Sequence, residues 1–593
     1  MPFYKSYESI INWIHQKLSA KQFLIFSSML VGLTAGIAAV VLKTLVHYIH
    51  LAITRDHSIS LQYYFYLAFP LIGILLTVFY VQKYRKGKLG RGTSNVLHAI
   101  AKKSSFLPKD QMYSHIITSS LTVGFGGSAG LESPIITTGS AIGSNYSKTY
   151  HVNYKDRTLL LASGAAAGIA AAFNAPIAGV LFALEVLLVN AGISAFIPLL
   201  IAAAVGALCS KIILKEGILL SFHLQQSFDY HNVPFYILLG VLAGFVSLYY
   251  SRISLKIESL FKPQKKQKVY LKALIGGSVL ALLILLFPPL FGEGYESVKM
   301  LSDLKPEKLL EKGFFSGYMD NEWVVLFFVG GIVLLKAIAT SITISSGGNG
   351  GNFAPSLFVG AYLGFFFSRL LNMLGIALMP ESNFTIVGMA GILSGVFYAP
   401  LTAIFLIAEI TGGYELMIPL MIVSAVSYTV VKYFEPYSMD TKRLAKKGHI
   451  FTQNKDKNIL NALKMEKIIE TDFQKISPEA TLRQFVDVIA HSKRNIFPVV
   501  TENDQLAGVI LLENVREIMF KTELYDQVLV KELMRKPPGE VNSDEAMYSV
   551  MKKFDETGAW NLPVLDNGKY VGFVSKSSIF TNYRKMLIKS SLD

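Results

Sequence analysis

The chain has 593 residues, of which 52% are hydrophobic and 16% are charged, and its formal net charge is +15. A single cysteine, Cys209, excludes a disulfide framework and a cysteine metal cluster. The lysines and arginines gather in short stretches beside apolar runs, without an aromatic stacking motif. This pattern argues against a nucleic-acid partner and favours cytoplasmic loops of a membrane protein.

Long apolar runs dominate the chain before about residue 435, and their lengths are those of membrane-spanning segments. Several contain clusters of glycine and proline, so we expect broken helices among the straight spans. The segment Met1–Gln22 is polar and amphipathic, so we expect no removable signal peptide and a cytoplasmic N-terminus. The runs are 22–47, 63–82, 159–189, 193–213, 235–250, 271–292, 324–340, 354–379, 385–411 and 415–433.

An internal repeat divides this apolar part into two halves. Pro176 and Pro400 are separated by 224 residues, and so are Glu185 and Glu409 in the same two passages. Upstream, GLESP at 130–134 and GNFAP at 351–355 share a G-x-x-x-P pattern. Segments interrupted by Gly and Pro at matching places in two halves predict a transport site near the membrane midplane. Helix N-termini with free N–H groups there favour an anion.

After Lys447 the chain becomes richer in charged residues, and short β-rich runs alternate with amphipathic helical stretches. The passages 497–515 and 562–579 form a second repeat, each with a turn signal between two strands. A helical stretch precedes each copy, at 480–493 and 544–558. The sequence therefore predicts a soluble, duplicated α/β tail.

These motifs together resemble the CLC chloride channel and transporter family. GLESP is similar to the family's G-R-E-G-P signature, GGNFAP at 350–355 matches its G-x-F-x-P signature, and 163–185 and 398–411 resemble two further signatures. The tail resembles a pair of CBS modules. The resemblance implies an all-α membrane domain over 1–446 with two inverted repeats, about 20–215 and 232–435. The CBS pair would occupy 447–593, with modules at about 465–523 and 528–587.

The resemblance also implies an anion site. Glu132 would be the gating glutamate, a carboxylate that occupies an anion position and leaves it when protonated or displaced. The backbone N–H groups of Leu131, Glu132, Asn352 and Phe353 would coordinate the halide. The alternatives are that Glu132 only caps a helix and that 345–353 is only a flexible loop.

The first departure from the family lies where its signature is G-S-G-I-P. This chain has Arg91, Gly92 and Thr93 there, so a serine hydroxyl and a proline are lost. Arg91 would either raise the positive potential of the pathway or extend to the cytoplasmic mouth. Thr93 and Ser94 are candidate substitute donors.

A second departure concerns the tyrosine that closes the inner end of the pathway in the family. Our alignment places Asp440 at that position, with Tyr437 three residues earlier. An ionised carboxylate there would repel an anion. Either the inner gate differs, or Asp440 is turned away from the pathway and paired with a nearby lysine or arginine, or the alignment is shifted and Tyr437 belongs at this position.

A third departure bears on proton coupling. Proton-coupled members usually carry two adjacent acidic residues at the end of the 163–185 signature, whereas here Glu185 is followed by Val186. Channel members commonly have valine there. We therefore favour a passive chloride channel, with a chloride/proton antiporter or a fluoride-handling member as the alternative. Glu185 and its counterpart Glu409 are expected to satisfy buried polar groups near helix ends.

The sequence predicts no enzyme, because no H-E-x-x-H motif, no nucleophile elbow and no paired metal spacing occurs among the 11 histidines. The expected partners are a second copy of the chain, the lipid bilayer and chloride. We expect no cofactor, because Asn514 and Ser578 stand where nucleotide-binding CBS modules usually have aspartate, which disfavours adenine nucleotide. We expect a bacterial inner membrane location with a cytoplasmic tail.

Overall fold

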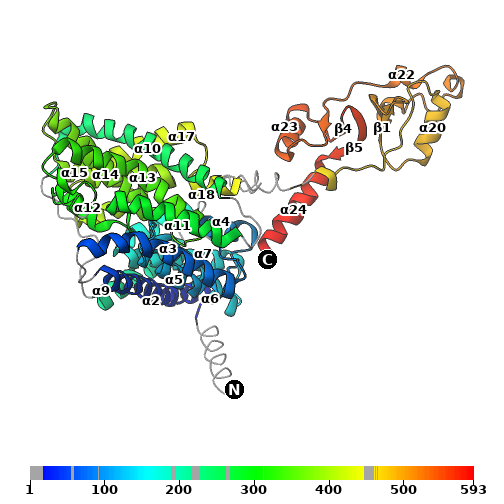
Figure 1. Ribbon diagram of the computed structural model, residues 1–593. Helices are drawn as coiled ribbons and strands as arrows, with labels where there is room; N and C mark the ends of the chain where they lie inside the picture. The colour runs from blue at the N-terminus through cyan, green and yellow to red at the C-terminus, as the bar shows by residue number, and fades with distance from the viewer. Residues whose placement is uncertain are drawn as a thin grey trace. The chain divides into compact units, whose positions relative to one another are not determined.

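The computed structural model describes residues 18–54, 59–90, 92–188, 195–214, 227–261, 268–311, 313–445, 460, 463 and 465–592. The chain forms two compact units, Met1–His449 and Ile450–Asp593. The first is helical and the second combines small sheets with helices (Figure 1).

Helices follow one another throughout the first unit. In its first half they are α2 (Ala20–Thr54), α3 (Ile59–Arg85), α4 (Gly92–Lys102), α5 (Gln111–Gly124), α6 (Glu132–Thr149), α7 (Tyr154–Phe173), α8 (Pro176–Phe182), a π-turn (Ala183–Leu187) and α9 (Phe196–Leu214). In its second half they are α10 (Val233–Leu260), α11 (Lys268–Leu286), α12 (Tyr295–Ser302), α13 (Glu322–Ser345), α14 (Phe353–Met373), α15 (Glu381–Phe397), α16 (Pro400–Thr411), α17 (Met417–Phe434) and α18 (Met439–Ala445). Among the described residues, 8 helices are long and apolar enough to cross a membrane.

Two of the expected apolar runs are broken, as the glycine and proline pattern predicts. Run 159–189 divides into α7 and α8 at Asn174, and run 385–411 divides into α15 and α16 at Tyr398. Both residues have left-handed backbones, with φ of 53° and 59°. A left-handed residue ends a helix, and proline two residues later starts the next one at its first turn.

Glycine contacts repeat in the two halves. A Cβ on Gly164 of α7 would lie 2.0 Å from the carbonyl oxygen of Gly139 on α6. A Cβ on Gly388 of α15 would lie 2.3 Å from the carbonyl oxygen of Gly360 on α14. The two pairs are related by the same separations, 221 and 224 residues, as the sequence motifs. This correspondence confirms the internal duplication and shows that each helix pair packs backbone against backbone.

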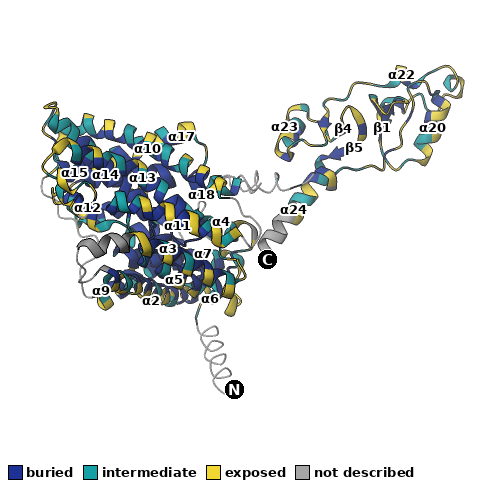
Figure 2. Ribbon diagram, in the orientation of Figure 1, coloured by how far each residue is buried: buried dark blue, intermediate teal, exposed yellow. Residues whose placement is uncertain are grey.

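Much of the helical unit is buried (Figure 2). Its interior holds polar side chains as well as apolar ones. All residues of α15 are buried, and α7 is buried from Leu159 to its end. Lys336 of α13 is fully buried. A lysine inside an apolar helix bundle needs polar partners there.

The second unit contains two copies of the expected pattern. The first copy has α20 (Leu482–His491), β1 (Ile496–Val500), β2 (Leu506–Leu511), α21 (Leu512–Val515) and α22 (Val530–Leu533). The second has β3 (Val541–Asn542), α23 (Met547–Thr557), β4 (Asn561–Asp566), β5 (Lys569–Ser575) and α24 (Lys576–Leu592). Strands β1 and β2 pair antiparallel, as do β4 and β5, and β3 runs parallel to β4. The predicted strand–turn–strand units and their preceding helices are confirmed.

The close crossing of α6 and α7 generates a prediction. Gly164→Val should prevent correct packing, because the new side chain would clash with the backbone of Gly139, which cannot move aside as a side chain could. Overpacking of this kind lowers the free energy of unfolding by about 1–3 kcal/mol. Gly413→Val is the matched control, because no heavy atom lies within 4 Å of the Cβ position at Gly413. Size-exclusion chromatography of detergent-solubilised protein should show aggregation of the first variant alone. A monodisperse, equally stable Gly164→Val protein would contradict the packing argument.

Candidate functional site

The starts of two half-helices are held together at the centre of the first unit. The backbone N–H of Gly130 donates to the carbonyl of Gly351 at 3.0 Å, and the N–H of Gly351 donates back at 2.8 Å. Helix α6 begins two residues after Gly130, and α14 begins two residues after Gly351. The N–H groups of both first turns, which have no partners within their own helices, are therefore brought near one another.

Glu132 lies at this junction and is 3% exposed. Its Oε1 accepts a hydrogen bond from the hydroxyl of Tyr295 at 2.8 Å, and its Oε2 accepts one from the N–H of Ala354 at 3.2 Å. The carboxylate thus starts on α6 and binds the first turn of α14. It occupies a place where backbone N–H groups would receive an anion.

Asn352 and Phe353 are buried at the start of α14. The Oδ1 of Asn352 accepts a hydrogen bond from the hydroxyl of Tyr250 at 3.1 Å. The Phe353 ring lies between those of Phe173 and Phe397, with centroid distances of 5.8 and 5.4 Å. Burial and bonding of these residues contradict the alternative that the segment is only a flexible loop.

A second carboxylate, Glu293, lies on the other side of Leu131. Its Oε1 accepts a hydrogen bond from the Leu131 N–H at 3.2 Å. Lys43 of α2 is close enough to interact electrostatically with both Glu293 and Glu132, and Lys336 of α13 interacts with Glu293. Two glutamate and two lysine side chains therefore lie near one another at the junction.

Sequence analysis missed these neighbours of Glu132. Two signals could have indicated them. Lys43 and Lys336 are charged residues inside predicted spans, where an ionisable side chain is itself a sign of function. Glu293 and Tyr295 stand in the segment FGEGYE at 291–296, another glycine-rich interruption next to an apolar run.

The structure also brings the start of α4 to this region. Arg91 lies outside the described residues. Gly92 has φ of 68°, and a Cβ on it would lie 3.3 Å from the Oγ of Ser133 in α6. Thr93 is buried next to it. The segment that replaces the family's first signature therefore approaches the start of α6.

Asp440 is buried at the start of α18 and is paired. Its Oδ1 accepts a hydrogen bond from the Ser94 hydroxyl at 2.9 Å and forms a salt bridge with Arg443 at 3.0 Å. Of the alternatives considered for this position, the geometry matches the paired aspartate. The Ser94 hydroxyl therefore donates its hydrogen bond to Asp440 in this arrangement.

Tyr437 lies elsewhere. It is half-buried and lines a small pocket with Tyr398, Glu435 and Lys442, and that pocket includes none of the predicted anion-binding residues apart from Tyr437 itself. The hydroxyl of Tyr398 donates to the Glu435 carbonyl at 2.6 Å. The role of Tyr437 at an inner gate stays a prediction.

Glu185 and Glu409 cap each other's half of the repeat. Glu185 accepts hydrogen bonds from the N–H groups of Leu401 and Thr402 at 3.0 and 2.7 Å, at the start of α16. Glu409 accepts them from Ile177 and Ala178 at 3.0 and 2.9 Å, at the start of α8. Both carboxylates thus have the polar partners near helix ends that the sequence predicts, and their role in transport stays a prediction.

Val186 follows Glu185 within the π-turn and is half-buried. An apolar side chain therefore follows Glu185 in the structure.

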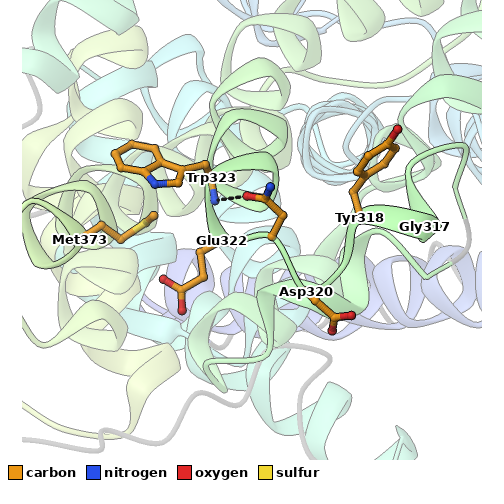
Figure 3. Close-up of a pocket in the computed structure, with 7 residues that line it drawn as sticks. Gly317, Tyr318, Asp320, Glu322, Trp323 and Met373 are labelled. Carbon is orange, nitrogen blue, oxygen red and sulfur yellow. Dashed lines mark hydrogen bonds between the residues drawn. The ribbon is translucent and has the colours of Figure 1, made fainter.

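A surface pocket of about 510 Å³ lies away from this centre, at the start of α13. Asn321, Glu322 and Trp323 line it together with Met373 of α14, and the Asn321 side chain accepts a hydrogen bond from the Trp323 N–H at 3.1 Å (Figure 3). This bond caps α13. None of the predicted site residues lines the pocket, so we give it no part in transport.

Comparison with known proteins identifies the fold around the junction. The family model described as voltage gated chloride channel matches residues 72–432, and the CBS domain model matches residues 465–521 and 530–585. The chain belongs to the CLC family. Its membrane unit is thus a CLC-type inverted repeat, and its second unit is a CBS pair.

Individual CLC relatives are distant. The chloride channel protein CLC-e of Arabidopsis thaliana is 27% identical over 438 residues, which cover 68% of this chain and 59% of the relative. The H(+)/Cl(-) exchange transporter ClcA of Vibrio campbellii is 30% identical over 310 residues, which cover 51% of this chain and 62% of the relative. The chain thus matches less than two thirds of the length of each of these proteins.

Two solved structures share the CLC fold. A slow cyanobacterial Cl−/H+ antiporter superposes with a TM-score of 0.60 and 22% identity, covering 73% of this chain and 99% of the antiporter. A eukaryotic CLC transporter has a TM-score of 0.58 and 18% identity, covering 94% of this chain and 97% of that one. At these identities the likeness is one of fold.

The reciprocal caps generate a prediction. Glu409→Ala leaves two N–H groups at the start of α8 without their carboxylate, and each buried unpaired group costs about 1–3 kcal/mol. We expect a lower unfolding temperature in detergent. Glu415→Ala, which removes an exposed glutamate just past α16, the helix that carries Glu409, is the control. Equal unfolding temperatures for the two variants would refute the capping role.

Proposed function

We propose that the protein exchanges chloride for protons across a membrane, with Glu132 as the gate. The observation that carries this proposal is the bond from Ala354 N–H to the Glu132 carboxylate, which joins the two halves of the repeat. A side-chain anion held by backbone N–H groups resembles a halide bound by the same groups. Displacement or protonation of that side chain would then open the site.

Backbone donors suit transport because they bind weakly. A lysine placed directly on the anion would hold it too tightly for rapid release, whereas N–H groups and helix dipoles provide partial charges. Lys43 and Lys336 instead donate hydrogen bonds to backbone carbonyls, to Ala172 and Gly292 respectively. Each side chain thus directs a donor to the backbone.

Sequence analysis favours a channel on the strength of Val186, whereas relatives favour exchange. Several curated relatives from Vibrio species are H(+)/Cl(-) exchange transporters. The passive channel is the second candidate, supported by the apolar Val186 where proton-coupled members usually carry an acid. An exchanger of this kind needs a proton route that bypasses Val186.

We propose further that the protein works as a homodimer in a bacterial cell membrane, with both the N-terminus and the CBS pair cytoplasmic. The CBS pair would serve dimer assembly in preference to nucleotide sensing. Asn514 and Ser578 support this assignment, because neither offers the carboxylate that binds ribose hydroxyls. The thermal unfolding of the full chain should therefore be unchanged by millimolar ATP, and a saturable shift would contradict this assignment.

The decisive experiment measures the reversal potential of purified protein in planar bilayers under a fixed chloride gradient. Exchange predicts that this potential moves when the pH is stepped on one side, because protons cross with chloride. A potential that stays at the chloride equilibrium value would overturn exchange and favour the channel.

Replacing the gate generates a further prediction. Glu132→Gln removes the titratable group but keeps hydrogen-bonding atoms for Tyr295 and Ala354. Anion flux into liposomes should persist and lose its dependence on pH and on the proton gradient. Glu415→Gln, an exposed position, should behave as the parent protein. A well-folded Glu132→Gln variant with the parent's pH dependence would rule out the gating role.

A further inference from the structure

The loop before α12 reaches the gate from the second half of the chain. The N–H of Gly292 donates to the carbonyl of Gly126 at 3.1 Å, which fixes the loop against the segment before α6. The Nζ of Lys336 donates to the Gly292 carbonyl at 3.0 Å and lies 4.5 Å from the centroid of the Phe358 ring. These contacts hold the loop from two sides and present the next residue, Glu293, to α6.

Glu293 accepts a hydrogen bond from an N–H group that the proposed anion site needs. The Leu131 N–H, to which its carboxylate binds at 3.2 Å, is one of the groups expected to coordinate the halide. Glu132 binds the matching start of the second half through Ala354. Tyr295, two residues after Glu293, donates to Glu132. One short loop therefore contributes a carboxylate of its own and holds the other.

The two carboxylates differ in access. Glu132 is 3% exposed, whereas Glu293 is half-buried. Their charges interact with each other and with Lys43, and that of Glu293 also interacts with Lys336. Where a glutamate here is ionised, it and an entering chloride carry like charges at close range and repel each other. A carboxylate must withdraw or be neutralised as the anion enters.

We propose that Glu293 is a second carboxylate of the gate, which competes with the entering anion for the Leu131 N–H. The inference rests on the proposed function and deepens it, since it assigns the anion pathway two side-chain competitors, one bound at the start of α6 and one at the start of α14. Glu293, as the more exposed one, is the first that an anion meets. The anion with which Glu293 competes is the small monovalent anion that the pathway carries.

Glu293→Gln in the full chain tests this role. The amide oxygen still accepts from Leu131 and the volume is unchanged, so the loop keeps its anchor while the negative charge is lost. Chloride binding by isothermal titration calorimetry should become roughly tenfold tighter, because a like charge next to the anion is removed. Chloride uptake into liposomes at low external chloride should rise in parallel. Glu296→Gln removes an exposed carboxylate three residues later and should bind chloride as the parent does.

The double variant Glu132→Gln/Glu293→Gln sharpens the test. If both side chains compete with one anion, their effects on chloride affinity should depart from additivity, whereas effects that simply add would overturn a shared gate. Unchanged affinity in folded Glu293→Gln, with or without a lower unfolding temperature, would also overturn it. If Glu132→Gln still abolishes the pH dependence in that case, the proposed function stands alone. If Glu132→Gln also has no effect, the proposed function fails as well.

Discussion

Two hydrogen bonds between Gly130 and Gly351 hold the start of α6 against the start of α14. Neither position tolerates a side chain. A Cβ on Gly130 would lie 2.4 Å from Oε2 of Glu132, and one on Gly351 would lie 2.4 Å from Cβ of Ser133. Everything at the junction depends on this close approach, because it brings the free N–H groups of two half-helices within reach of one carboxylate.

The glycine crossings of α6 with α7 and of α14 with α15 continue the same constraint along the helices. Backbone contact leaves no room for side chains, so each half-helix is fixed in position relative to its neighbour. The carboxylates of Glu185 and Glu409 do the same for α16 and α8, each reaching from one half to the other. Each half-helix is thereby positioned by contacts that the duplication supplies twice, which fixes the backbone around the Glu132 side chain.

The sequence predicted the helical membrane unit, its breaks, its duplication and the CBS pair, because these depend on local patterns of apolar residues, glycine and proline. The prediction of Glu132 at a helix start also came from a local motif. What it could not supply were contacts across long separations. Tyr295 and Glu293 meet Glu132 and Leu131 across more than 160 residues, and no periodicity relates them. The pairing of Asp440 with Ser94 spans 346 residues in the same way.

In the proposed gate, the free energy that holds Glu132 in place matters as well as the architecture around it. Hydrogen bonds to a charged group contribute about 1.5–3 kcal/mol each. The bonds from Tyr295 and Ala354 therefore stabilise an ionised Glu132 in its observed position by a few kcal/mol. A shift of about 5.5 kcal/mol converts a state populated at 1% into one populated at 99%. The Tyr295 bond, made by the first residue of α12, would supply about 1.5–3 kcal/mol of that range, and Lys336 holds the preceding loop through the Gly292 carbonyl. A change in the Tyr295 bond would alter how firmly Glu132 is held without altering the helices, whereas Val186 lies on a different element, the π-turn after α8.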